Sequence, residues 1–192
     1  MRGQLGTLLP RQSGRQRPGN RAAALRYAAW DWPITPNAAL PATADLEQVF
    51  AAWSRIPDAP ILAACGVAFD VIEADAPSAR AALARLDRLG VAVGPVTVGP
   101  SHIGFLVRAG SAAALSPLIV PRSGPMLTGP GAYFELPRTV DPATPRAGAA
   151  VSADRRWLRM PDTARPTLPS AHVIFGALAL VPHRDTAPMF RR

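Results

Sequence analysis

Apolar positions recur with a helical period in several separate segments of the chain. In "TADLEQVFAAWSRIP" (43–57) they fall three or four residues apart and form one stripe: Leu46, Val49, Phe50 and Trp53. Thr43 or Asp45 can cap this helix, and Pro57 ends it. A second helix is predicted in "PSARAALARLDRLG" (77–90), with Gly90 as its stop and three leucines on one side: Leu83, Leu86 and Leu89. Weaker helical patterns lie in 21–30, 111–119 and 169–180.

Short apolar runs between these helices predict strands. The most apolar is "APILAACGVAFDVIEAD" (59–75), which fits a pair of strands or one long bent strand. Two strands that meet near Gly99 and Pro100 are predicted in 91–110. Further strands are expected in three segments: 31–36, 126–137 (with a Gly-Pro-Gly turn) and 155–161. This order predicts an α+β (mixed α/β) domain, with helices flanking one mixed sheet.

Composition divides the chain into one domain and two tails. Residues 1–20 are rich in Gly, Pro, Gln and Arg, which predicts a disordered basic tail. We expect a single domain over 21–183 and a C-terminal tail over 184–192. Neither an apolar run long enough to span a membrane nor a secretory signal is present, so a cytoplasmic protein without a membrane partner is expected. The single cysteine, Cys65, excludes a disulfide framework and is expected to be a core thiol.

The positive charge is concentrated at one end. The net charge is +8, and all 21 basic residues are Arg. Six of them lie in the first 26 residues, which hold no acidic residue, so the rest of the chain is nearly balanced. Such a tail can contact nucleic-acid phosphates, or it can simply be solvated.

Three carboxylates end the most apolar strand: Asp70, Glu73 and Asp75. Side chains alternate along a strand, so Glu73 and Asp75 project together and Asp70 faces the other way. Two carboxylates about 7 Å apart on one strand can converge on a hard cation. The other interpretation is structural: Asp75 caps the following helix, and Glu73 lies at the solvated end of the sheet. The spacing alone leaves both open.

Of the three histidines in the chain, only His102 is a candidate for binding or catalysis. His102 follows Ser101 at the start of a predicted strand, where the pair can bind a phosphate or assist proton transfer, or be an exposed turn. His172 and His183 have no acidic or Cys partner at metal-ligand spacing. The chain contains no P-loop, no GxSxG motif, and no GxGxxG motif followed by a helix.

Several segments, in order, resemble the N-terminal domain of bifunctional DNA primase/polymerases, the prim-pol branch of the archaeo-eukaryotic primase superfamily. They are "ALRYAAWDWPITP", "FAAWSRIPDAPILAACG", "FDVIEAD", "GPSHIGFLV" and "RWLRMP…LPSAHVIFGAL". Together they span about residues 21–181. The resemblance implies an RRM-like core, DNA as template, and NTPs or dNTPs as substrates.

The resemblance also implies roles for single residues. Glu73 and Asp75 would hold Mg²⁺ or Mn²⁺, and His102, helped by Ser101, would contact the phosphates of the incoming nucleotide. Glu73, Asp75 and His102 would then be the catalytic residues. The chain departs from the family pattern in having Glu for the first Asp and in a compressed turn before the His. A third acid is not apparent, and "GPMLTGPGAYFELP" offers only Glu135.

Three functions are therefore to be distinguished. The first is metal-dependent addition of nucleotides to a nucleic-acid strand. The alternative is a catalytically degenerate prim-pol-like domain that binds nucleic acid or protein as an accessory in replication or mobile-element biology. The third is a domain with neither activity, whose acids only cap a helix and face solvent.

Overall fold

The computed structural model of the chain describes residues 20–118, 124–138, 155–161 and 166–181. Its helices are α1 (Arg21–Ala29), α2 (Leu46–Arg55), α3 (Ala76–Arg88), the 3₁₀ helix η1 (Ala113–Leu118) and α4 (Ala171–Ala179). Its strands are β1 (Ile34–Thr35), β2 (Leu62–Ala64), β3 (Phe69–Asp75), β4 (Val96–Val98), β5 (His102–Arg108), β6 (Met126–Thr128), β7 (Tyr133–Glu135) and β8 (Arg156–Arg159). The α+β class is confirmed, and the predicted order of elements holds. The tail assigned to 184–192 lies outside the described residues.

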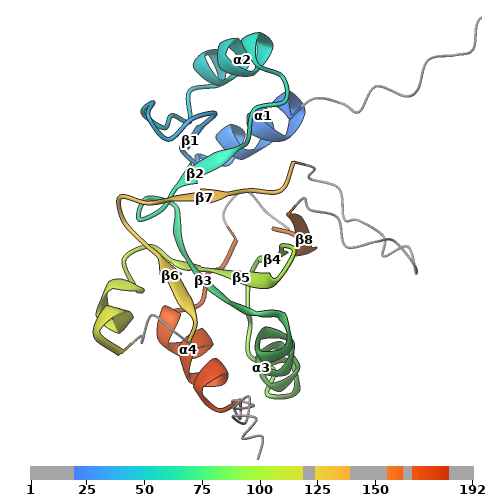
Figure 1. The fold of residues 1–192 in the computed structure, drawn as a ribbon, viewed down its shortest axis with the longest axis vertical. Coiled ribbons are helices and arrows are strands. Elements are labelled where there is room, and N and C mark those ends of the chain that lie inside the picture. The colour runs from blue at the N-terminus through green and yellow to red at the C-terminus, as the bar shows by residue number, and fades with distance from the viewer. Residues whose placement is uncertain (1–19, 119–123, 139–154, 162–165, 182–192) are drawn as a thin grey trace, which may run out of the picture.

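The strands form two sheets rather than the one mixed sheet that was expected. A three-stranded sheet has the order β1-β2-β7, and a five-stranded sheet the order β6-β3-β5-β4-β8 (Figure 1). Every pairing in the described residues is antiparallel. The predicted strands 59–75 and 126–137 each break in the middle and send one half into each sheet.

Glycine and proline cause these two breaks. Gly66, between β2 and β3, has φ +87°, and a Cβ there would come within 2.6 Å of Pro130 Cα. Pro130 belongs to the Gly-Pro-Gly turn between β6 and β7, so the two crossings between the sheets touch each other. Only glycine allows both the left-handed backbone and this close approach at position 66.

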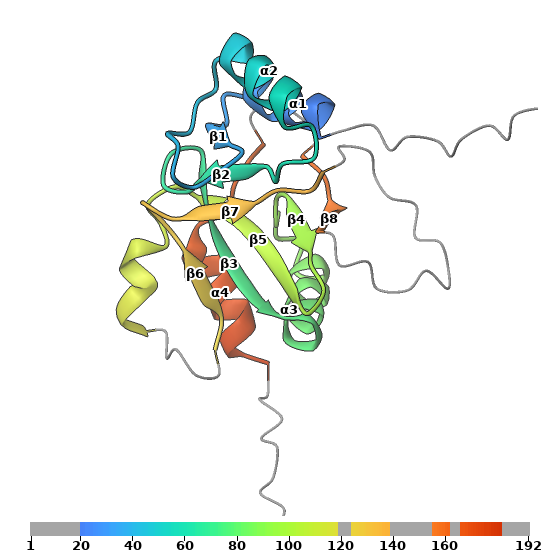
Figure 2. The same cartoon turned by 45° about the horizontal axis from the view of Figure 1, so that its top comes forward.

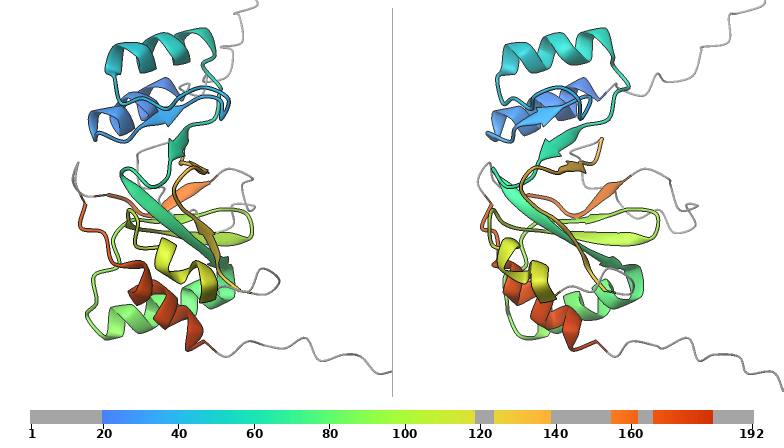
Figure 3. Two further views of the ribbon diagram at one scale, coloured as in Figure 1. Left: turned by 90° about the vertical axis from the view of Figure 1, so that its left-hand side faces the viewer. Right: turned by 60° about the vertical axis from the view of Figure 1, so that its left-hand side comes forward.

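Two hydrophobic cores lie on opposite faces of the five-stranded sheet. One face packs against α3, α4 and η1 through residues that include Ile72, Phe105 and Ile174. The other packs toward the three-stranded sheet and α1 through Phe69, Val71, Leu106 and neighbours. Figures 2 and 3 show α3 and α4 on the side of the five-stranded sheet away from α1 and α2.

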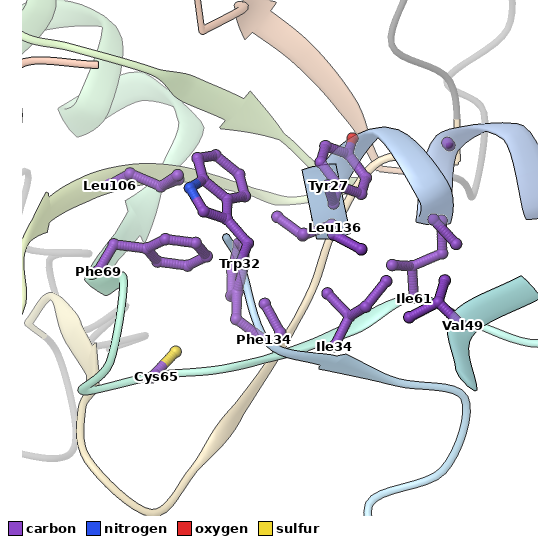
Figure 4. Close-up of a cluster of buried hydrophobic side chains, with 14 of the residues drawn as sticks. Tyr27, Trp32, Ile34, Val49, Ile61, Cys65, Phe69, Leu106, Phe134 and Leu136 are labelled. Carbon is purple, nitrogen blue, oxygen red and sulfur yellow. The ribbon is translucent and has the colours of Figure 1, made fainter. Parts of the chain in front are cut away.

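The second core is rich in aromatic rings. Trp32 stacks on Tyr27 with ring centroids 5.7 Å apart and meets the edge of Phe69 at 4.8 Å (Figure 4). Tyr27 Oη accepts a hydrogen bond from Trp157 Nε1 at 2.9 Å and donates one to the Pro137 carbonyl at 2.8 Å. This buried pair joins α1 to β8, the last strand in the described part of the chain.

Three side chains assigned to apolar stripes are not buried. Leu46 and Phe50 of α2 are each 50% exposed, and Leu89, just after α3, is 65% exposed. Only one narrow side of α2 meets the core, through Val49 and Trp53. Phe50 instead lies under the Arg21 guanidinium, 5.0 Å from the ring centroid.

The folded part also begins earlier than expected. Asn20 was assigned to the tail, but it is 5% exposed. Its backbone N–H donates to the Pro57 carbonyl at 2.9 Å, and its side chain donates to the Ala59 carbonyl at 2.7 Å. These bonds fix the start of α1 against the end of α2. Residues 1–19 lie outside the described part of the chain.

Candidate functional site

The central strand pair brings the predicted site residues to one end of the five-stranded sheet. In the antiparallel register of β3 and β5, Glu73 lies opposite Gly104, and Asp75 lies opposite His102. Val71, on the same face as Glu73, belongs to the aromatic-rich core, whereas Ile72 belongs to the core under α3 and α4. The expected alternation along this strand is therefore present.

Glu73 forms an ion pair with Arg155. Arg155 Nη1 lies 2.9 Å from Glu73 Oε1, and the side chains are only 18% and 12% exposed, respectively. Glu73 thus points neither to bulk solvent nor to a second carboxylate. Its charge is balanced by a residue that directly precedes β8, on the far side of β5 and β4.

The Arg155 guanidinium is held by three groups. Nη1 also donates to Thr97 Oγ1 at 3.3 Å, and the guanidinium carbon lies 4.3 Å from the centroid of the Phe134 ring. Gly104 has no side chain and so leaves space for Thr97 and Phe134. A Cβ at position 104 would lie 2.8 Å from Thr97 Oγ1 and 3.1 Å from Phe134 Cζ. An ion pair, a hydrogen bond and a cation–π contact therefore position one cation over the sheet.

Asp75 caps α3. Its side chain accepts a hydrogen bond from the backbone N–H of Ser78 at 3.0 Å, and Pro77 stands in the first turn. Partial burial acts to raise the pKa of Asp75, but the hydrogen bonds from Ser78 and the nearby His102 outweigh it and lower the pKa below the usual carboxyl value. The structural interpretation of Asp75 is thus confirmed by this contact.

Ser101 and His102 form the pair that their positions suggested. Ser101 Oγ lies 2.8 Å from His102 Nδ1, and the hydroxyl donates when that nitrogen carries no proton. The Ser101 carbonyl accepts from the Ala76 N–H at 3.1 Å, which ties this turn to the start of α3. Ser101 is exposed and His102 half-buried, so the pair remains accessible beside Asp75.

Asp70 and Cys65 lie apart from this group. Asp70 is fully buried on the opposite face of β3, where Oδ2 accepts weakly from the Ala112 N–H at 3.4 Å and Oδ1 has no hydrogen-bond partner among the described residues. Cys65 is buried as expected. Burial, with the added charges of Asp70 and Glu73, raises the pKa of the Cys65 thiol to about 12, which disfavours the thiolate form at neutral pH.

The donor set as folded does not fit a divalent cation. Within the described ranges, no three His, Cys, Asp or Glu side chains gather closely enough to hold a metal ion. Glu73 is engaged by a guanidinium and Asp75 by a helix N-terminus. Glu135, the one further acid the sequence offered, lies on β7 of the other sheet, with its Oε1 3.9 Å from Arg138.

Arg155 is the site residue that the sequence did not predict. It was placed at the start of the closing strand, with no assigned role. No local pattern signals its contact with Glu73, because the two residues are far apart in the chain and their strands are separated by β5 and β4. The Arg-Arg-Trp start of this strand is its only distinctive local feature.

Two further findings concern the described helices and the similarity of the chain to known protein families. No helix in the described ranges is long and apolar enough to cross a membrane. Comparison with curated proteins and with solved structures finds no match. A family model described as "Bifunctional DNA primase/polymerase, N-terminal" matches residues 18–149, more than half of the chain, including Glu73, Asp75, Ser101 and His102. The chain therefore belongs to the family of bifunctional DNA primase/polymerase N-terminal domains.

Proposed function

We propose that this primase/polymerase-like domain binds a nucleic-acid strand and does not itself add nucleotides to it. The observation that carries this proposal is the ion pair between Glu73 and Arg155. Nucleotide addition by a carboxylate pair needs both acids to share a cation that neutralises the phosphates. Here one acid is already neutralised by an internal guanidinium, and the other serves as a helix cap.

Nucleic-acid binding is supported by the family and by charge. The chain carries 21 arginines against 13 acidic residues, and most of this excess lies in its first 26 residues. At the site, His102 and Arg155 lie close to the hairpin between β4 and β5: a Cβ on Gly99 would be 3.7 Å from the guanidinium carbon of Arg155. Arg156, the next residue, is exposed. Arginine side chains beside a turn of small residues can contact the phosphates of a nucleic-acid backbone.

The competing function is metal-dependent nucleotide addition, with Mg²⁺ or Mn²⁺ and with NTPs or dNTPs as substrates. It would require Glu73 to exchange Arg155 for a metal and a third ligand to come from elsewhere. The two functions predict opposite results in one assay. Template-directed dNTP incorporation is to be measured with Mg²⁺ and with Mn²⁺, beside binding of labelled single-stranded DNA by fluorescence anisotropy.

We expect wild-type protein to bind the DNA with an affinity that falls as salt rises, and to incorporate no nucleotide above background. The test variant is Glu73→Ala with Asp75→Ala. The matched control is Glu135→Ala with Asp45→Ala, which removes another Arg-paired glutamate and another helix cap. Incorporation by wild type and control that disappears in the test variant would establish the enzyme instead. Absence of DNA binding would contradict the binding function.

A further inference from the structure

We propose that Arg155 is the contact for a backbone phosphate of the bound strand, and that Glu73 is an internal competitor that weakens this contact. The inference rests on the proposed nucleic-acid binding and assigns its residues. It gives Glu73 a role opposite to that of a metal ligand: its negative charge opposes binding instead of supporting it.

The Arg155 guanidinium is held in one orientation, but in the described residues only one of its three nitrogens makes a polar contact. Both of its polar contacts, to Glu73 Oε1 and Thr97 Oγ1, are made by Nη1. In the described part of the chain, Nε and Nη2 have no hydrogen-bond partner. These two nitrogens form one edge of the guanidinium fork, the edge with which arginine binds two oxygens of a phosphate.

Packing holds this edge in one orientation. The Phe134 ring covers one face of the guanidinium, with the guanidinium carbon 4.3 Å from its centroid. Gly99 and Gly104 line the strands beside it, and neither adds a side chain to the space around the guanidinium. An arginine that is already oriented loses less conformational freedom when it binds, so its contact with a phosphate is stronger than that of a mobile surface arginine.

The carboxylate of Glu73 acts against this contact. At 2.9 Å from Nη1 it cancels most of the positive charge that a phosphate would meet. It is also only 12% exposed, so water screens it less than it would a surface acid. A phosphodiester at the free edge would stand within several ångströms of a second negative charge, which repels it.

Glu73→Gln separates the charge of this side chain from its geometry. Glutamine keeps the size and shape of this side chain, and Thr97 and Phe134 still hold the guanidinium, while the negative charge is removed. We expect Glu73→Gln to bind single-stranded DNA about three- to tenfold more tightly than wild type at moderate salt. Arg155→Gln is expected to weaken binding and to lower the slope of log affinity against log salt by about 0.7, the value for one phosphate contact.

The probe is a fluorescein-labelled single strand of about 20 nucleotides, titrated by anisotropy at several salt concentrations without divalent metal. Glu135→Gln is the control for Glu73→Gln, because it removes one negative charge from an exposed glutamate that is also near an arginine. Arg80→Gln, on the exposed side of α3, is the control for Arg155→Gln. Both controls are expected to change affinity less than their test variants. The double variant Glu73→Gln with Arg155→Gln should bind no more tightly than Arg155→Gln alone.

An affinity of Glu73→Gln equal to or below that of wild type overturns the inference, as does a gain that survives in the double variant. Thermal unfolding of each variant shows whether a loss of affinity comes from a loss of fold; if Arg155→Gln is unfolded, Glu73→Gln alone decides. Failure of the proposed function is a different result. If the proposed function is wrong, neither wild type nor Glu135→Gln binds DNA at any salt concentration used.

Discussion

Two acids on one strand, Glu73 and Asp75, have different surroundings in the folded protein. Glu73 is largely buried and paired with a cation, whereas Asp75 is exposed and bonded to a helix N-terminus. The helix cap was one of two interpretations that the sequence allowed, because Asp before Ala-Pro-Ser is a typical helix start. The partner of Glu73 was not foreseeable, since it depends on tertiary pairing.

Asp75→Ala is predicted to lower the free energy of unfolding at neutral pH by about 1 kcal/mol, through loss of the cap on α3. The pKa of Asp75 is lowered by folding, so its contribution is complete above the ordinary carboxyl pKa. The contribution disappears as pH falls through the folded value, and variant and wild type should then converge. Urea unfolding at neutral and acidic pH measures this difference.

Ser170→Ala is the control for that cap. Ser170 precedes α4 but makes no side-chain hydrogen bond to the helix N-terminus. Its replacement should change the free energy of unfolding by less than about 0.5 kcal/mol. A difference between Asp75→Ala and wild type that persists in acid would contradict the charge-dependent part of the cap.

Among the elements, the long pair β3 and β5 determines which residues meet at the site. Its register sets a glycine, Gly104, opposite Glu73, and this glycine makes room for Thr97 and Phe134. The pattern of apolar residues predicted both strands and the hairpin that leads into β5. It did not predict that 59–75 and 126–137 would each be divided between two sheets, because an apolar run does not show which sheet will bury it.

Gly104→Ala is predicted to destabilise the protein by about 1–3 kcal/mol, because the new Cβ would overlap Thr97 Oγ1 and crowd Phe134. It should also displace Arg155 and so weaken DNA binding. The measurements are urea unfolding and anisotropy. Gly176→Ala is the matched control: it lies in α4 with no atom within 4 Å of a new Cβ, and it should stabilise the helix by about 0.5–1 kcal/mol. Equal effects of the two variants would contradict the packing around Gly104.

At the scale of the whole molecule, the first helix and the last strand are joined through buried polar atoms. Trp157 Nε1, from the last described strand, donates a hydrogen bond to Tyr27 Oη, from the first helix, within a cluster of aromatic rings. Burial raises the pKa of Tyr27 well above its ordinary value, so this hydroxyl remains a donor to Pro137 throughout the physiological range. The sequence predicted a helix over 21–30 and a strand over 155–161, but not the direct contact between them.

Tyr27→Phe is predicted to lower the free energy of unfolding by about 1–3 kcal/mol, because it leaves Trp157 Nε1 and the Pro137 carbonyl without partners in a buried setting. Urea unfolding followed by tryptophan fluorescence measures the loss. Tyr133→Phe is the control, since its hydroxyl makes only a 3.4 Å exposed contact to Leu40. A loss in Tyr27→Phe no larger than in the control would contradict this role.

The sequence therefore predicted the class and the order of elements from local patterns, and the family from the resemblance of several segments taken in order. It placed Glu73 and Asp75 at the end of one strand and Ser101 and His102 at the start of another, and the register of β3 and β5 brings these two strand ends side by side. The sequence could not predict that Glu73 is paired with a cation. That pairing depends on Arg155 and on the two residues that hold it, Thr97 and Phe134, which come from three other segments.

Arg155 lies beyond residue 149, where the match to the family ends. The family match therefore covers the acids Glu73 and Asp75 but not the cation that pairs with Glu73. A comparison restricted to the matched segment would show both acids without the group that neutralises one of them. To judge whether the acids of a related chain are open to a metal, the closing strand has to be inspected along with them.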